Sequence, residues 1–172
     1  EELPGELIEA VSRRGKYLLL ETNKGTLIIH LGMSGSLRIV DRSRIPQKHD
    51  HVDIVFTDDL ILRYTDPRRF GCILWDSGPI ESHPLLAKLG PEPLEKDFHA
   101  DYLFEKSRCR SAPIKSFIMD SKTVVGVGNI YANESLFMAG INPKRAAGKV
   151  SKPRYEKLAR CIRQVLQRAI DV

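Results

Sequence analysis

The sequence lacks the long apolar run that a membrane-spanning helix requires. Its longest apolar stretches, residues 17–20 and 26–31, are far shorter than the ~20 residues needed to cross a bilayer, so we expect no membrane span. Cysteine is also scarce. Cys72, Cys109 and Cys161 form no CxxC pair, no zinc-ligand spacing and no even-numbered disulfide framework. We therefore expect a reducing, cytoplasmic location and no metal bound by this chain.

Neither sign of charge dominates the composition strongly. The 172 residues contain 27 Lys and Arg against 22 Asp and Glu, a net charge of +5 that favours an anionic partner without identifying it. The 42% hydrophobic and 28% charged residues are ordinary globular usage, which excludes collagenous and wholly disordered chains. The length fits one sizeable domain or two small ones.

The two ends carry no usual boundary signals. The chain opens with Glu1 instead of Met and shows no basic-then-apolar leader, and the last predicted helix has no Gly or Pro terminator. We expect the sequence to be an interior piece of a longer protein.

The first half has the pattern of β-structure. Short apolar or alternating stretches are separated by turn residues, which predicts six strands at 16–21, 26–31, 36–40, 51–56, 60–64 and 71–76. Such spacing indicates an antiparallel meander that closes into a sandwich or barrel.

The second half has the pattern of helices, predicted at 97–106, 112–119, 129–138 and 153–172. Four prolines punctuate the stretch between the halves. The order predicts an α+β chain with a partial β-sandwich domain at 1–76, a connection at 77–96 and a helical domain at 97–172.

The turn before the third predicted helix could bind an anion. Gly126 and Gly128 permit a close backbone approach, and Asn129 is a good N-cap, so the turn could present N–H groups and a helix dipole to a phosphate. An ordinary corner between two helices explains the glycines equally well.

The loop at 66–71 places Arg68 and Phe70 between two predicted strands. Arginine can hydrogen-bond an unpaired base and phenylalanine can wedge between stacked bases, a combination suited to opening a duplex. Alternatively, Arg69 pairs with Asp66 and Phe70 belongs to the core. Met33, in the glycine-bounded turn 32–35, is either a second apolar wedge or packs inward.

Several basic residues could form a phosphate-binding groove only if they share a face with these loops. Lys16 begins an apolar strand and either contacts a phosphate or protects a sheet edge. His49 and His51 have strand spacing but no third ligand nearby, which favours a phosphate contact or a surface position over a metal. The remaining candidates for such a groove are Lys48, Arg108, Arg110 and Lys115.

Taken together, these segments closely resemble the bacterial formamidopyrimidine-DNA glycosylases, repair enzymes that excise 8-oxoguanine. The resemblance runs from about Val11 to the end and rests on RGKYLLL (14–20), HLGMSGSL (30–37), KHDHVD (48–53), YTDPRRFG (64–71), LGPEPL (89–94) and VGVGNIYANE (125–134). Six such motifs in this order are highly specific.

The resemblance implies a role for each matching position. Met33 fills the gap left by a flipped nucleotide, Arg68 reaches the orphaned base and Phe70 wedges the duplex. Phosphate-binding positions match Lys16, His49 and Asn129, with Tyr131 in the same helix–two-turn–helix element, and Lys115 lies near the lesion pocket. The implied partner is double-stranded DNA containing an oxidised purine, bound by a monomer.

Two parts of the family pattern are absent. The family's nucleophile is the secondary amine of an N-terminal proline assisted by a glutamate, and Pro4 is not terminal, so no catalytic role is carried over to Glu1, Glu2 or Pro4. The family's four-cysteine zinc finger would follow the last helix, so zinc is expected only outside this chain. The resemblance implies a glycosylase and AP lyase whose present fragment is inactive alone. The alternatives are a catalytically silent damaged-DNA-binding module and, more remotely, an RNA-binding structural protein.

Overall fold

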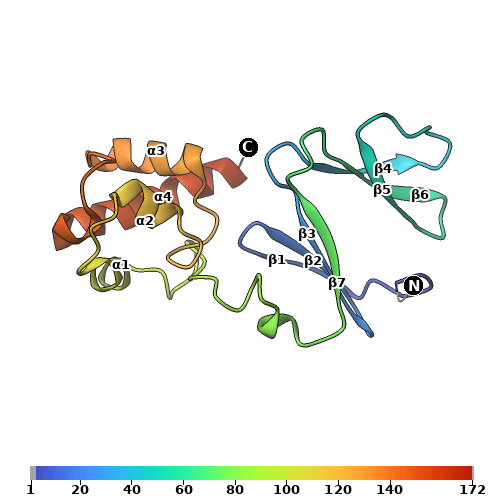
Figure 1. Ribbon diagram of the computed structural model, residues 1–172, viewed down its shortest axis with the longest axis horizontal. Helices are drawn as coiled ribbons and strands as arrows, with labels where there is room; N and C mark the ends of the chain where they lie inside the picture. Colours follow the sequence, from blue (N-terminus) through green and yellow to red (C-terminus); the bar gives the residue numbers. More distant parts are fainter. Residues whose placement is uncertain (1–2, 172) are drawn as a thin grey trace. The chain divides into compact units, whose positions relative to one another are not determined.

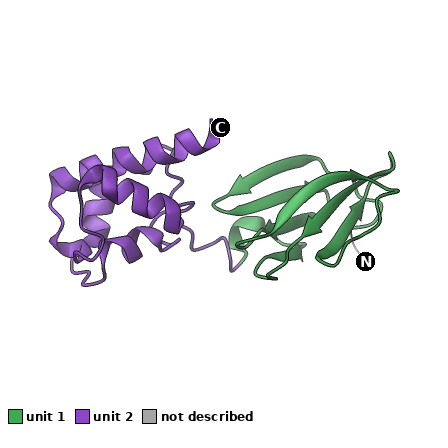
Figure 2. Cartoon of the chain, turned by 90° about the horizontal axis from the view of Figure 1, so that it is seen from above, with its two compact units in different colours: residues 1–83 green, residues 84–172 purple. Residues whose placement is uncertain are grey.

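The computed structural model describes residues 3–171. The chain divides into two compact units, residues 1–83 and residues 84–172, which are coloured separately in Figure 2. The boundary falls between two of the prolines in the stretch 77–96. Each unit has its own core, and each is described by itself.

The first unit consists of strands and a single turn of 3-10 helix (Figure 1). Its elements are β1 (Ala10–Arg14), β2 (Tyr17–Thr22), β3 (Gly25–His30), β4 (Ser36–Asp41), β5 (Asp50–Val55), β6 (Leu60–Thr65), β7 (Cys72–Asp76) and η1 (Ile80–Ser82). The six predicted strands correspond to β2 to β7, with ends that differ by one residue at most positions.

The strands form two antiparallel sheets, in the orders β1-β2-β3-β7 and β4-β6-β5. The expected simple meander is therefore wrong in the second sheet, where β6 and not β5 is central. β6 has three buried residues, whereas β5 has none, and a central strand is the one covered on both edges. The residues 42–49 between β4 and β5 allow the chain to skip this central position.

Side chains from both sheets meet in one apolar core. Leu20, Leu27 and Ile29 are its buried centre, and residues of the second sheet, including Leu37, Ile54 and Leu62, pack against it. Two sheets joined by such a core are a β-sandwich, as the sequence predicts.

Strand β1 was not predicted from the sequence. It has no fully buried residue and pairs on one side only, so its short sequence, AVSRR, has a weak strand pattern. Its presence corrects the expectation for Lys16, which lies, exposed, in the two-residue turn between β1 and β2 and not in a strand. Gly15, at φ 59°, supplies the positive dihedral that such a tight hairpin needs.

The second unit is helical, with α1 (Ala100–Ser107), α2 (Ile114–Met119), α3 (Asn129–Ala139), η2 (Ala147–Lys149) and α4 (Lys152–Ile170). All four predicted helices are present. Their core includes the fully buried Phe98, Leu136 and Ile162, together with Tyr155, whose hydroxyl donates to the carbonyl of Ala147 at 3.1 Å. Within residues 3–171, no helix is both long and apolar enough to cross a membrane.

The segment before α1 belongs to this helical unit. The N–H of Gly90 donates to the carbonyl of Ser121 at 2.8 Å, and the N–H of Val125 donates to the carbonyl of Pro91 at 3.2 Å. These bonds hold residues 90 and 91 against the segment that leads into the glycine turn before α3.

Candidate nucleic-acid interface

Two exposed loops of the β-sandwich unit lie against each other: residues 31–35, between β3 and β4, and residues 66–71, between β6 and β7. We call them the wedge loops. A Cβ atom on Gly71 would lie 2.1 Å from the hydroxyl of Tyr64 and 2.4 Å from the carbonyl oxygen of His30. A Cβ on Gly32 would lie 2.6 Å from the backbone of Gly71. Only glycine permits this close approach of the two loops.

A single buried carboxylate holds the wedge loops together. Asp66 is fully buried, and one of its oxygens accepts hydrogen bonds from the Ser34 hydroxyl at 2.7 Å and the Arg68 N–H at 3.3 Å. The other oxygen accepts from the Tyr64 hydroxyl and the Gly71 N–H, both at 2.9 Å. The carboxylate is thus engaged by four donors, in place of the Arg69 pairing that the sequence left open.

These hydrogen bonds shift the pKa values of both Asp66 and Tyr64. The Gly71 N–H, followed by the Ser34 hydroxyl, holds the pKa of the Asp66 carboxyl well below its usual range. Burial, followed by the hydrogen bond to Asp66, raises the pKa of Tyr64 to about 12. Asp66 is therefore an anion and Tyr64 a neutral donor at any physiological pH.

The tips of the wedge loops carry exposed apolar side chains. Met33 is 70% exposed and Phe70 is 59% exposed, so neither belongs to the core. The Arg68 guanidinium lies 4.8 Å from the centroid of the Phe70 ring, a cation–π distance. Arg69, at φ 56°, takes the left-handed backbone conformation that turns the chain between Arg68 and Phe70. The three residues predicted to open a duplex thus share one rim.

The turn at His49, which we call the His49 turn, and His51 at the start of β5 are also hydrogen-bonded to Asp66. The carbonyl of His49, which is half-buried, accepts the N–H of Asp66 at 3.0 Å. The Nε2 atom of His51 lies 2.9 Å from the Asp66 carbonyl oxygen; since a carbonyl can only accept, Nε2 carries the proton and donates. His51 is therefore a structural residue, whereas the His49 ring remains a candidate contact.

His30 connects this region to the turn that holds Lys16. Its Nδ1 accepts the N–H of Gly32 at 3.0 Å, and its ring lies 4.9 Å from that of Tyr17. Burial, and secondarily the charge of Lys16, lowers the pKa of His30. The Lys16 charge thus acts on His30, the residue directly before loop 31–35.

In the helical unit, the turn before α3 has the geometry that its glycines suggest. Gly126 takes φ 81°, and Gly128 is the N-cap of α3. Asn129 is the first helical residue instead of the cap, which corrects the sequence interpretation. Its exposed side chain is not used to cap the helix and stands beside the positive end of the helix dipole.

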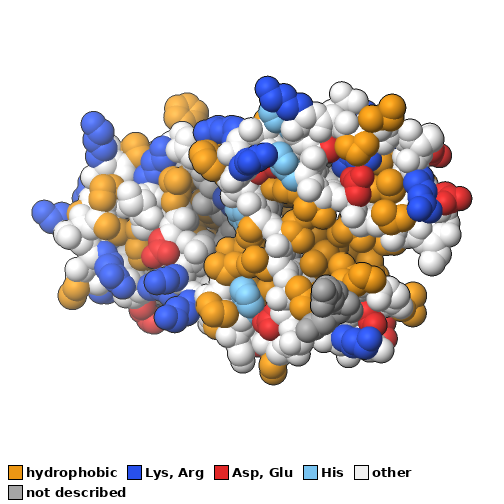
Figure 3. All heavy atoms as spheres, turned by 45° about the vertical axis from the view of Figure 1, so that its right-hand side comes forward, with side chains coloured by type: hydrophobic (Ala, Val, Ile, Leu, Met, Phe, Trp, Pro, Cys, Tyr) orange, Lys and Arg blue, Asp and Glu red, His pale blue; other side chains and the backbone are white. Residues whose placement is uncertain are grey.

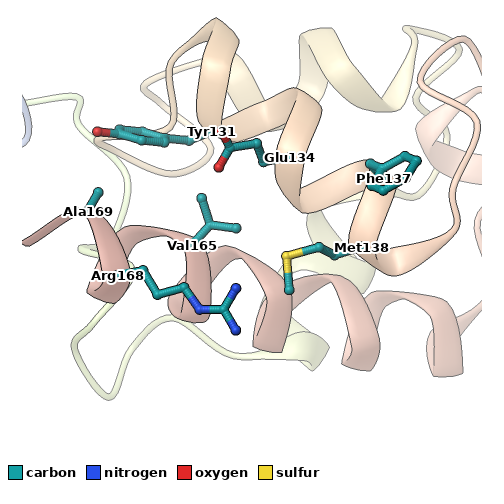
Figure 4. A pocket seen from close by; sticks show the side chains of 7 residues that line it. All are labelled: Tyr131, Glu134, Phe137, Met138, Val165, Arg168 and Ala169. Atoms are coloured by element: carbon teal, nitrogen blue, oxygen red, sulfur yellow. The ribbon is translucent and has the colours of Figure 1, made fainter. Parts of the chain in front are cut away.

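Tyr131 and Lys115 lie in the same unit but in different settings. Tyr131 lines a groove of about 370 Å³ between α3 and α4, where Figure 4 shows it on the same side as Glu134 and above Val165 and Arg168 of α4. Lys115 is partly buried near the start of α2, where its N–H donates to the carbonyl of Pro143 at 3.3 Å.

Arg108 is a structural residue and not part of a basic groove. Its guanidinium stacks 3.9 Å above the ring of Phe104 and donates to the carbonyls of Phe104 and Val150. Arg110, by contrast, is exposed.

Positive charge is concentrated in the helical unit. Residues 84–172 contain 16 Lys and Arg against 9 Asp and Glu, whereas residues 1–83 contain 11 against 13. Figure 3 shows Lys and Arg side chains spread over the visible face of the helical unit. The surplus is in the unit whose α3 N-terminus also favours anions.

The part of the chain that the structure describes contains no group of three or more His, Cys, Asp or Glu side chains that could hold a metal ion. Cys72 is half-buried, Cys109 is exposed and Cys161 is buried in α4. Glu1 and Glu2 lie outside the described residues, and Pro4 is exposed.

Sequence reasoning missed Ser34 and Tyr64 as partners of Asp66, for which it considered Arg69 only as an alternative. The available signal was the position of Asp66, directly after a strand and before a proline, where aspartate commonly accepts hydrogen bonds from the following turn. That signal identifies a turn, but it does not reveal donors from a loop 32 residues earlier in the chain.

Both units match models of one protein family. The formamidopyrimidine-DNA glycosylase N-terminal domain matches residues 1–73, and the formamidopyrimidine-DNA glycosylase H2TH domain matches residues 89–172.

Full-length relatives agree with this match. The chain is 64% identical over 170 residues to a formamidopyrimidine-DNA glycosylase of Cellvibrio japonicus and 57% identical over 171 residues to one of Idiomarina loihiensis. Each comparison covers 99% of this chain and 63% of the relative, so the chain spans about 63% of the length of these relatives.

Solved structures give the same result. The chain matches the Lactococcus lactis enzyme non-covalently bound to DNA containing an AP site, with 36% identity and a TM-score of 0.92, over 99% of this chain and 66% of that one. It matches the same enzyme in complex with FAPY-dG-containing DNA with equal identity and TM-score, over 64% of that chain.

A β-sandwich domain followed by an H2TH domain is the arrangement of the class of DNA glycosylases that these family models and solved structures represent. Within that class, this chain belongs to the formamidopyrimidine-DNA glycosylase family.

Proposed function

We propose that this chain is the DNA-binding and duplex-opening part of a base-excision repair enzyme. The enzyme flips oxidised purines, 8-oxoguanine and formamidopyrimidines, out of double-stranded DNA and excises them, with an accompanying AP lyase activity. The observation that carries the proposal is the rim of the wedge loops, where Met33, Arg68 and Phe70 stand exposed over a rigid, buried base.

The rim supplies what base flipping requires. Extruding a nucleotide costs a few kcal/mol of stacking and pairing, which apolar side chains inserted into the gap offset. Met33 fills the space of the flipped nucleotide and Phe70 wedges the adjoining step. Arg68 has free guanidinium donors for the edge of the base left without a partner.

Phosphate contacts supply the affinity that is independent of sequence. Lys16 and His49 serve in the sandwich unit, and Asn129 serves at the N-terminus of α3, with Tyr131 in the same element. Lys115 stands near the extruded lesion. The protein acts as a monomer in the cytoplasm, and zinc belongs to a segment outside this chain.

The experiment measures binding and chemistry separately. The 172-residue chain is titrated into duplexes with and without 8-oxoguanine at several salt concentrations, and is then treated with borohydride to trap any imine. We expect salt-sensitive binding, no trapped adduct and no strand cleavage, because this chain has no terminal proline amine.

The full-length gene product is assayed in parallel. Excision of 8-oxoguanine by the full-length product, together with binding by the chain, supports the proposal. Binding without excision by the full-length product shows a catalytically silent damaged-DNA-binding module instead. Trapping at Pro4 or at a lysine of the short chain shows that the nucleophile lies within it and overturns the division of roles.

A further inference from the structure

We propose that Asp66 is a positioning residue for duplex opening: it fixes the wedge loops and the His49 turn in one arrangement, so that the intercalating and phosphate-binding side chains act together. This inference rests on the proposed function and adds to it a residue that touches no DNA.

Asp66 connects three separate segments of the chain. Its carboxylate joins loop 31–35 through Ser34 and its own loop through the N–H groups of Arg68 and Gly71. Its backbone N–H donates to His49, and its carbonyl accepts from His51. Each segment carries at least one side chain assigned to DNA: Met33, Arg68 with Phe70, and His49.

The arrangement requires a carboxylate and not merely a small polar side chain. All four groups facing the two oxygens are donors, and a carboxylate is an acceptor at both oxygens. An asparagine of the same shape has one acceptor oxygen and an NH₂ group. That NH₂ would face either Tyr64 and Gly71 or Ser34 and Arg68. The hydroxyl of the pair can turn to accept from the NH₂, but the backbone N–H of Gly71 or Arg68 cannot, so it would lose its bond to residue 66.

The bonds act on the rim directly. The bonded N–H groups of Arg68 and Gly71 stand on either side of the Arg69–Phe70 pair, so releasing them frees the backbone that aims the ring. Ser34 is the immediate neighbour of Met33. A displacement of about 1 Å at a reacting or wedging group can lower a rate by roughly a hundredfold.

The test uses the full-length gene product and two readouts. Fluorescence of 2-aminopurine placed opposite a stable abasic-site analogue reports unstacking, measured with each variant at saturating concentration so that affinity does not enter. Single-turnover excision of 8-oxoguanine reports the overall step. We expect Asp66→Asn to reduce the fluorescence rise to the level of Phe70→Ala and to lower excision roughly ten- to a hundredfold.

A double-mutant cycle separates positioning from general destabilisation. If Asp66 acts through the wedge loops, Asp66→Asn combined with Phe70→Ala is no worse than Phe70→Ala alone, because the aim of a missing ring does not matter. Fully additive losses contradict the inference. Ser34→Ala removes one donor to Asp66 and one acceptor of the Arg68 N–H, both between the two loops, and leaves the carboxylate in place. It gives a smaller loss of the same kind and serves if Asp66→Asn folds poorly.

The matched control is Asp53→Asn. The Asp53 carboxylate accepts two hydrogen bonds of 2.8 Å from Arg63 on β6 of the same sheet and bonds to neither wedge loop. This variant is expected to lose stability but to keep the full fluorescence rise at saturation.

The possible failures are distinguishable. If Phe70→Ala lowers the fluorescence rise while Asp66→Asn and Ser34→Ala match the parent protein, the positioning role is overturned and the proposed function stands. If Phe70→Ala and Met33→Ala both leave the fluorescence rise unchanged, the wedge loops do not open the duplex and the proposed function itself is overturned.

Discussion

The exposure of Phe70 makes a prediction that separates a wedge from a core residue. Complete burial of a phenylalanine contributes about 1.5–3 kcal/mol. Because Phe70 is 59% exposed, only about two-fifths of that, near 1 kcal/mol, is at stake. The contact with Arg68 at 4.8 Å adds about 0.5–1 kcal/mol at such an exposed site. Phe70→Ala should therefore lower the free energy of unfolding by about 1–2 kcal/mol, against about 3–5 for a buried phenylalanine.

The sequence offers a convenient probe for this measurement. The single tryptophan, Trp75, lies on β7 and packs against the sandwich core, so its fluorescence in a urea titration reports the unfolding of the first unit alone. Ile29→Ala is the matched control, because Ile29 is fully buried in that core and its truncation should cost about 2–5 kcal/mol.

Activity should respond in the opposite order. Phe70→Ala in the full-length product is expected to lower 8-oxoguanine excision strongly while leaving most of the protein folded. A loss of stability as large as that of Ile29→Ala, with unchanged activity in the folded fraction, would refute the assignment of Phe70 as a wedge.

Four further predictions have defined outcomes. Arg68→Ala should lower the free energy of unfolding by only about 0.5–1 kcal/mol, the value of its contact with Phe70, and reduce discrimination among bases opposite the lesion by about 1–3 kcal/mol, measured as excision rates against each opposing base; unchanged ratios contradict a base contact. His49→Ala and Asn129→Ala should weaken duplex binding equally for all sequences, and Lys16→Ala should also reduce the slope of log affinity against log salt by about 1; sequence-dependent losses exclude phosphate contacts. The folded state lowers the pKa of Asp66, so the stabilisation from its carboxylate is complete above the unfolded pKa of about 3.9 and is lost as the pH falls below that value. The difference in urea midpoint between the parent protein and Asp66→Asn should therefore be constant near neutral pH and narrow below about pH 4. Gly71→Ala should destabilise the first unit by about 1–3 kcal/mol, because the added Cβ would lie 2.1 Å from the Tyr64 hydroxyl, whereas Gly78→Ala, with its nearest neighbour at 3.3 Å, should have little effect.

Local sequence pattern was sufficient to predict the types of element in this protein. Six of the seven strands and all four α-helices follow from apolar spacing and turn residues, because alternation over a few residues or a 3-and-4 spacing is a property of neighbouring positions. The order of six motifs was also sufficient to indicate the family.

The pattern failed where an element depends on distant partners. β1 forms because β2 offers it an edge, and its own exposed residues carry little signal. The central place of β6 follows from which strand is covered on both sides, which no local alternation records.

The candidate site shows the same division. The sequence alone identified Met33, Arg68 and Phe70 as exposed-loop candidates, since their residue types and their flanking glycines are local features. Only the tertiary structure showed that Phe70 is exposed and lies outside the core, and it gave Asp66 partners that sequence reasoning had not assigned. A buried carboxylate takes whichever donors the fold brings within hydrogen-bond distance, and here one of them comes from a loop 32 residues away in the chain.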